Sequence, residues 1–146
     1  MARGSILERN SGNGGYLLPV LKISAAKSLD AIDDSGKVFI VANAGSAYSI
    51  SLPTTLEVGT QYKLIFEDSP NAAVTIAAGS AIMFGKIGEA EVDTSDDGPG
   101  SSAATGVSNV IIGTSAHKGD FIEMTYSNGA YWMFGSSAAD GAVTTS

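Results

Sequence analysis

The chain of 146 residues lacks cysteine, has a single histidine, His117, and carries few charged side chains. Without cysteine there can be no disulfide, no thiolate nucleophile and no cysteine-ligated metal, and one histidine excludes a multi-histidine metal site. No run of about 18 apolar residues is present, and the N-terminus lacks the apolar stretch of about 7–15 residues that a secretory signal needs. We therefore expect a protein made in the cytoplasm, with no membrane partner.

The charge balance is acidic, with 8 Lys and Arg against 15 Asp and Glu and a net charge of -7. This composition disfavours nucleic acid as a partner, because binding phosphates requires several basic side chains on one face. Charged residues make up only 16% of the chain and hydrophobic residues 44%, which is typical of a folded domain. With so few charges to cover its surface, such a domain is expected to bury part of that surface against neighbours.

The N-terminal segment differs from the rest of the chain. Residues 1–27 hold four basic residues and one acidic residue, and Asn10-Ser11-Gly12-Asn13-Gly14-Gly15 contains no apolar side chain. We predict an extended arm over residues 1–15, followed by a single domain over residues 16–146. The arginines Arg3 and Arg9 suit docking on a carboxylate-rich protein surface.

After the arm, apolar residues fall into short runs, several of which alternate with polar residues as half-buried strands do. Asn128-Gly129 is the strongest hairpin signal, because both central positions of a type I′ turn need a positive φ. Residues 25–32 fit a short helix or a loop equally well. The pattern predicts an all-β fold, an antiparallel β-sandwich with a jelly roll as its expected topology. The expected strands are Tyr16–Ile23, Lys37–Ala42, Ala47–Leu52, Gln61–Glu67, Val74–Ala77, Ala81–Ile87, Val107–Ile112, Asp120–Tyr126 and Ala130–Phe134.

A long acidic loop is expected at about residues 89–104, where Asp93-Thr94-Ser95-Asp96-Asp97-Gly98 follows Glu89 and Glu91. Its spacing does not match a calcium-binding EF-hand, and carboxylate pairs of this kind occur on any acidic surface. His117 precedes a strand in a glycine-containing turn, and no Gly-x-Ser-x-Gly turn accompanies it. We therefore predict no catalytic residue, no metal site, no cofactor and no enzymatic activity.

Aromatic residues gather around the predicted C-terminal hairpin. Tyr126, Tyr131 and Trp132 are candidate contacts for a glycan or a neighbouring subunit, and Phe134 lies near them in the sequence. Cross-strand aromatic pairs also stabilise sheets, so a core or subunit contact is the favoured role.

Over about residues 30–135 the chain resembles small β-sandwich structural proteins of tailed bacteriophage virions, of the capsid decoration or cement type. The segments that carry the resemblance are Ser35–Val41, Ala47–Pro53, Val58–Phe66, Val74–Ile76, Lys118–Met124 and Ser127–Gly135.

The resemblance implies a non-enzymatic virion protein that is made in the host cytoplasm and binds the outer capsid surface. The expected partners are the major capsid protein and two further copies of the chain, in a homotrimer. Arg3, Ile6, Leu7 and Arg9 are then the candidate contacts to the shell or to a subunit. The alternative is a tail-fibre or head-fibre module that binds a host surface glycan.

Overall fold

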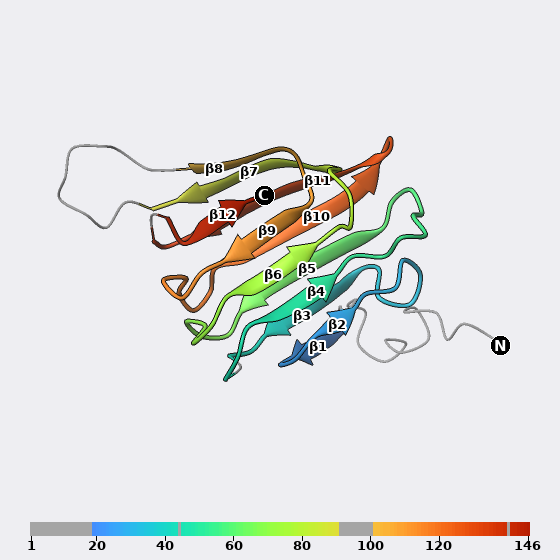
Figure 1. The fold of residues 1–146 in the computed structure, drawn as a ribbon. Coiled ribbons are helices and arrows are strands. Elements are labelled where there is room, and N and C mark those ends of the chain that lie inside the picture. The colour runs from blue at the N-terminus through green and yellow to red at the C-terminus, as the bar shows by residue number, and fades with distance from the viewer. Residues whose placement is uncertain (1–18, 44, 91–100, 140) are drawn as a thin grey trace, which may run out of the picture.

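The computed structural model describes residues 19–43, 45–90, 101–139 and 141–146, which form two β-sheets packed face to face (Figure 1). The strands of both sheets run along the same diagonal in this view, as in an aligned sandwich. The seven-stranded sheet has the order β1 (Val20–Ile23), β3 (Lys37–Val41), β5 (Gln61–Phe66), β10 (Phe121–Ser127), β11 (Ala130–Ser137), β7 (Met83–Glu89) and β8 (Ser101–Val107). The five-stranded sheet has the order β12 (Val143–Thr145), β9 (Asn109–Ile112), β6 (Val74–Ala77), β4 (Tyr48–Ser51) and β2 (Lys27–Ser28). The predicted all-β sandwich is confirmed.

The pairing within each sheet is mixed, which corrects the expectation of a purely antiparallel, jelly-roll arrangement. From β1 to β7 the chain passes alternately between the two sheets, so that β1, β3 and β5 lie parallel in one and β2, β4 and β6 lie parallel in the other. Loops such as 29–36 and 52–60 carry the chain across the sandwich instead of turning it back beside itself. Side chains alternate in the same way in parallel and antiparallel strands, so alternation could not distinguish the two.

The parallel strands form successive coils that repeat one another. Phe39 of β3 lies beside Leu64 of β5, and Ile50 of β4 lies beside Ile76 of β6. Each coil therefore places apolar side chains directly above those of the next coil.

The hairpin β10–β11 follows the prediction closely. Asn128 has a φ of 52° and Gly129 a φ of 78°, and the ladder closes at the pair Ser127 and Ala130. This hairpin lies between the parallel coils and β7, because β10 pairs antiparallel with β5 and β11 pairs parallel with β7.

Three local expectations are changed by the structure. Residues 25–32 contain strand β2 and a turn rather than a helix. The segment expected as one strand over 107–112 is divided at Ser108, with β8 and β9 in different sheets. The acidic loop is shorter than predicted, because β7 continues through Glu89 and β8 begins at Ser101.

The core lies between the two sheets and draws on nearly every strand. Its largest fully buried side chains are Tyr62, Tyr131, Phe39, Phe66, Ile50, Leu64, Ile76, Met83, Ile87, Ile112, Ile122 and Met124. Burial of this apolar surface is the main stabilising contribution to the fold. The outer faces of the sheets are therefore left to make contacts with other molecules.

Candidate functional site

The outer face of the seven-stranded sheet carries aromatic side chains that do not enter the core. Strand β11 buries Tyr131 and Met133, so Trp132 and Phe134 point to the opposite side, where they are 49% and 58% exposed. Phe84 of β7 and Phe121 of β10 are half-buried on this same side. We call Phe84, Phe121, Trp132 and Phe134 the aromatic face.

Trp132 is held in a fixed position on this face. Its Nε1–H donates a hydrogen bond to the Ser127 carbonyl oxygen at 3.0 Å. Its ring contacts Phe84, the residue beside it on β7, with 5.7 Å between ring centroids and an interplanar angle of 33°. A large aromatic side chain that is already ordered loses little conformational entropy when a partner covers it.

A shallow groove of about 410 Å³ runs beside Phe134 across β3, β5 and β10. Lys63 and Glu123 form an ion pair within it, and the Lys63 ammonium also lies 5.1 Å from the centroid of the Phe121 ring. The groove thus offers hydrogen-bond donors and acceptors next to exposed aromatic surface. The remaining lining residues are Gly36, Lys37, Val38, Gln61, Tyr62, Met124 and Thr125.

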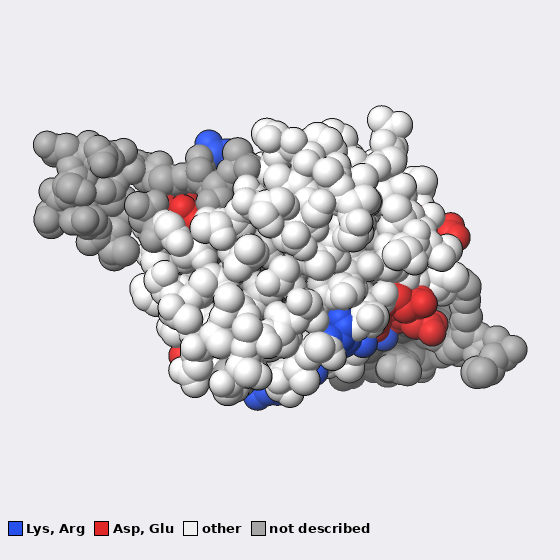
Figure 2. All heavy atoms as spheres, in the orientation of Figure 1, with Lys and Arg blue, Asp and Glu red and all other residues white. Residues whose placement is uncertain are grey.

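The outer face of the five-stranded sheet has a different chemistry. In Figure 2 no Lys, Arg, Asp or Glu appears over the centre of the view, where β4, β6 and β9 lie. The outward residues there are small or uncharged, with Ser49, Thr75 and Ile111 in one cross-strand row. Large exposed aromatic surface thus belongs to the seven-stranded sheet.

The structure separates the three aromatic residues singled out from the sequence. Trp132 lies on the aromatic face, but Tyr131 is fully buried and Tyr126 packs against the core, with its ring 5.1 Å from that of Tyr131. Burial raises the pKa of Tyr131 to about 12, and its hydroxyl has no hydrogen-bond partner among the described residues. Tyr131 thus takes the core role and offers no exposed surface to a glycan or a subunit, because adjacent strand residues point to opposite faces.

Sequence reasoning did not connect Phe84, Lys63 or Glu123 with Trp132. Phe84 is far from Trp132 in the sequence, and the parallel pairing of β7 with β11 brings them together. The sequence does indicate that Trp132 and Phe134 share a face, because residues two apart in a strand point to the same side.

Several sequence-predicted residues lie outside the described part of the chain. These are Arg3, Ile6, Leu7 and Arg9 of the predicted arm, and Glu91, Asp93, Asp96 and Asp97 of the acidic loop.

Asp34, Glu89 and Asp120 are the buried carboxylates among the described residues, and the last two link parts of the fold. Asp120 accepts hydrogen bonds from the backbone N–H of His117 and of Ala138 and from the Ser137 hydroxyl. Glu89 accepts from the backbone N–H of Gly141 and of Val143. Both carboxylates join strand ends to loops, and the His117 side chain is exposed.

Within the described ranges, no group of three or more His, Asp and Glu side chains is placed to hold a metal ion. The same ranges contain no helix that is long and apolar enough to cross a membrane. No protein-family model matches the chain, and no curated protein matches it.

Proposed function

We propose that the chain is a non-enzymatic structural protein of a phage virion, a capsid decoration or cement protein that binds the outer shell as a homotrimer. The observation that carries the proposal is the aromatic face, where Trp132 and Phe134 are about half exposed and Trp132 is held in place. Exposed aromatic clusters of this kind are typical of protein–protein contacts, in which Trp and other large side chains supply most of the binding energy.

In this role the aromatic face joins the copies of the chain, and Arg3, Ile6, Leu7 and Arg9 contact the major capsid protein. A protein that binds the assembled shell and not its dissociated parts stabilises the shell by mass action. Three linked arms bind more tightly than one, because after the first contact the others act at a high effective concentration. The resemblance of residues 30–135 to virion β-sandwich proteins also supports this role, which requires no reaction and no cofactor.

The direct test is co-sedimentation of the purified chain with expanded shells made of the major capsid protein of the same phage. The wild-type chain is expected to sediment with the shells. The double variant Trp132→Ser/Phe134→Ser is expected to bind at least about 100-fold more weakly, because loss of the trimer removes the gain from multiple contacts. The matched control is Val58→Ser, since Val58 is 78% exposed but lies outside the aromatic face. Failure of the wild-type chain to bind shells would contradict the proposal.

The second candidate function is glycan binding by a fibre module, and the groove beside Phe134 favours it. Lys63, Glu123, Gln61 and Thr125 offer polar groups for sugar hydroxyls, and the fixed Trp132 ring offers a flat apolar surface nearby. A glycan array probed with the wild-type chain and with Trp132→Ala tests this function. Binding of a defined glycan that is lost in the variant would favour the fibre module over the cement protein.

A further inference from the structure

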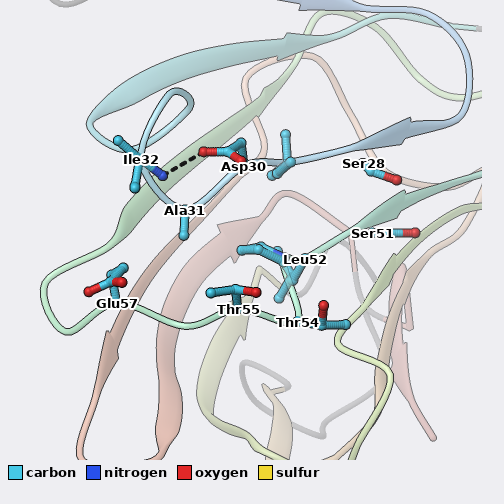
Figure 3. Close-up of a pocket in the computed structure, with 11 residues that line it drawn as sticks. Ser28, Asp30, Ala31, Ile32, Ser51, Leu52, Thr54, Thr55 and Glu57 are labelled. Atoms are coloured by element: carbon cyan, nitrogen blue, oxygen red, sulfur yellow. Dashed lines mark hydrogen bonds between the residues drawn. The ribbon is translucent and has the colours of Figure 1, made fainter. Parts of the chain in front are cut away.

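A second hollow, of about 360 Å³, opens at one end of the sandwich between the loop that follows β2 and the loop that follows β4. Figure 3 shows Asp30, Ala31 and Ile32 on one side of it and Thr54, Thr55 and Glu57 on the other. The buried side chains of Leu29, Ala31 and Leu52 make its base apolar. We call this the end hollow.

The wall of the end hollow is held in place by hydrogen bonds. The Asp30 carboxylate accepts from the backbone N–H of Ile32 at 2.7 Å and of Asp33 at 2.8 Å. From beneath, the Tyr62 hydroxyl donates to the Asp30 carbonyl oxygen and the Thr60 hydroxyl donates to the Ala31 carbonyl oxygen. The hollow is therefore formed before any partner enters it.

The rim of the end hollow is acidic. Nearby Asp34 is paired with Lys27 and Lys37, at 3.3 and 3.1 Å. Neither Asp30 nor Glu57, in contrast, has a Lys or Arg within salt-bridge distance in the part of the chain that the structure describes. The two backbone hydrogen bonds lower the pKa of Asp30, so its carboxylate is charged at neutral pH. An occupant of matching chemistry carries cationic side chains on either side of an apolar centre.

The sequence supplies such a segment close by. The segment Arg3–Arg9 has Ile6 and Leu7 between two arginines. The described chain begins at Pro19, whose carbonyl oxygen accepts from Val38 N–H, and the turn lining the hollow leads directly into β3. Residues 1–18 therefore join the domain at the end where the hollow lies. The ten residues from Arg9 to Pro19 can span up to about 33 Å, which is enough to reach it.

We propose that the end hollow binds the segment Arg3–Arg9 of the same chain, with Ile6 and Leu7 on the apolar base and the arginines beside Asp30 and Glu57. Guanidinium groups suit this rim because they pair with carboxylates through directed hydrogen bonds. A segment tethered by a short linker acts at an effective concentration in the millimolar range, so a weak intrinsic affinity is sufficient. In this position the four residues assigned to shell contact are covered, and the shell must compete for them. The inference goes beyond the proposed function and does not require it.

The test uses the absence of cysteine, which allows one spin label to be attached to the full-length chain through Ser5→Cys. The label is expected to broaden the backbone amide NMR signals of Thr54, Thr55 and Glu57 more than that of Ser69, which follows β5 at its far end. The double variant Asp30→Asn/Glu57→Gln should weaken docking about five-fold, since it removes two exposed charge pairs, and should reduce the broadening. The matched control Glu67→Gln/Asp68→Asn changes the net charge equally at the other end of β5 and should leave the broadening unchanged.

Three results would overturn the proposal. The first is equal broadening at Thr54 and Ser69, which would show that the segment does not prefer the hollow. The second is unchanged broadening in Asp30→Asn/Glu57→Gln, which would exclude the acidic rim. The third is broadening between spin-labelled chains and separate isotope-labelled chains in a mixture, which would make a second copy the source of the segment. Shell binding is measured separately, so failure here leaves the proposed function intact.

Discussion

Gly85 is a position where the fold leaves no room for a side chain. A Cβ atom built there would lie 1.7 Å from the Met133 carbonyl oxygen on the neighbouring strand, and the backbone has a φ of +147°. We predict that Gly85→Ala lowers the free energy of unfolding by about 3 kcal/mol or more, through strain in the β7–β11 ladder.

Urea denaturation of Gly85→Ala beside Gly88→Ala measures this effect. A Cβ at Gly88 would only touch the Gly135 carbonyl oxygen, at 4.0 Å. Gly88→Ala should therefore remain within about 1 kcal/mol of the wild type. Equal stability of the two variants would contradict the close approach of β7 to β11.

Tyr131 and Tyr62 are both buried, but their hydroxyl groups differ in hydrogen bonding. The Tyr62 hydroxyl donates to the Asp30 carbonyl oxygen at 2.9 Å, whereas that of Tyr131 has no partner among the described residues. We predict that Tyr131→Phe leaves the free energy of unfolding unchanged or raises it by up to about 1 kcal/mol. Tyr62→Phe should lower it by about 1 kcal/mol, because the partly buried Asp30 carbonyl oxygen loses this donor and keeps only the longer hydrogen bond from Asp34 N–H. Thermal denaturation of the two variants checks that Tyr131→Phe is the more stable of the two. A Tyr131→Phe variant less stable than Tyr62→Phe would contradict the prediction.

Tyr131 makes the stability of the fold depend on alkaline pH, as do Tyr62 and Tyr48, whose pKa values burial also raises. Burial raises the pKa of Tyr131 from 10.0 to about 12, so the folded chain retains a proton that the unfolded chain releases. The contribution of this retained proton to the free energy of unfolding is fully present below pH 10. It is lost as the pH rises from 10 through 12, by up to about 1.4 kcal/mol per pH unit. Tyr131→Phe should show a smaller loss over this range in urea titrations. Identical slopes for variant and wild type would show that Tyr131 is not the group responsible.

At the scale of elements, Asp120 joins the start of β10 to the end of β11. Its carboxylate accepts three hydrogen bonds, from His117 N–H, Ala138 N–H and the Ser137 hydroxyl, within 2.9 Å. We predict that Asp120→Ala lowers the free energy of unfolding by about 3 kcal/mol, because it removes three hydrogen bonds to a charged acceptor and leaves the Ser137 hydroxyl only its longer contact with the Ala139 carbonyl oxygen. Amide hydrogen exchange should become faster at His117 and Ala138.

The matched comparison is Ser137→Ala, which removes one of the three donors and keeps the carboxylate. It should cost about 1 kcal/mol and leave exchange at His117 slow. Fast exchange at His117 in both variants would contradict the assignment of this link to Asp120.

The sequence predicts the strands of this fold better than their pairing. A local pattern is enough to identify some elements. The alternation of Tyr48 and Ile50 identifies a strand, and Asn128-Gly129 identifies a hairpin. The two-residue strand β2 and the three-residue β12 are too short to show a periodicity. Parallel pairing arises because the chain crosses to the other sheet after each strand. Packing between residues that are distant in the sequence determines this crossing, so no local pattern predicts it.

The candidate site also combines features that local sequence predicts with features that depend on the pairing of distant strands. Trp132 and Phe134 lie two residues apart, so their common face follows from strand geometry alone. The positions of Phe84, Lys63 and Glu123 depend on the order β5–β10–β11–β7, which no local pattern specifies. Adjacent residues of a strand point to opposite faces, so the sequence alone is enough to predict that Tyr131 and Trp132 do not share a face.

At the scale of the whole molecule, the sandwich presents two outer faces of different character. One is largely uncharged and built from small side chains, and the other carries the aromatic face beside an ion pair. Because two of the aromatic side chains are about half exposed, self-association at this face is the main structural expectation.

The most direct test of this account is the mass of the purified chain in solution by light scattering, at low and at high salt. We predict a species of three times 14.8 kDa under both conditions, because salt screens charge pairs but does not weaken apolar contacts. The variant Trp132→Ser/Phe134→Ser should give the monomer mass, and Val58→Ser the wild-type mass. A wild-type chain that stays at 14.8 kDa at both salt concentrations would contradict the proposed trimer and the role of the aromatic face.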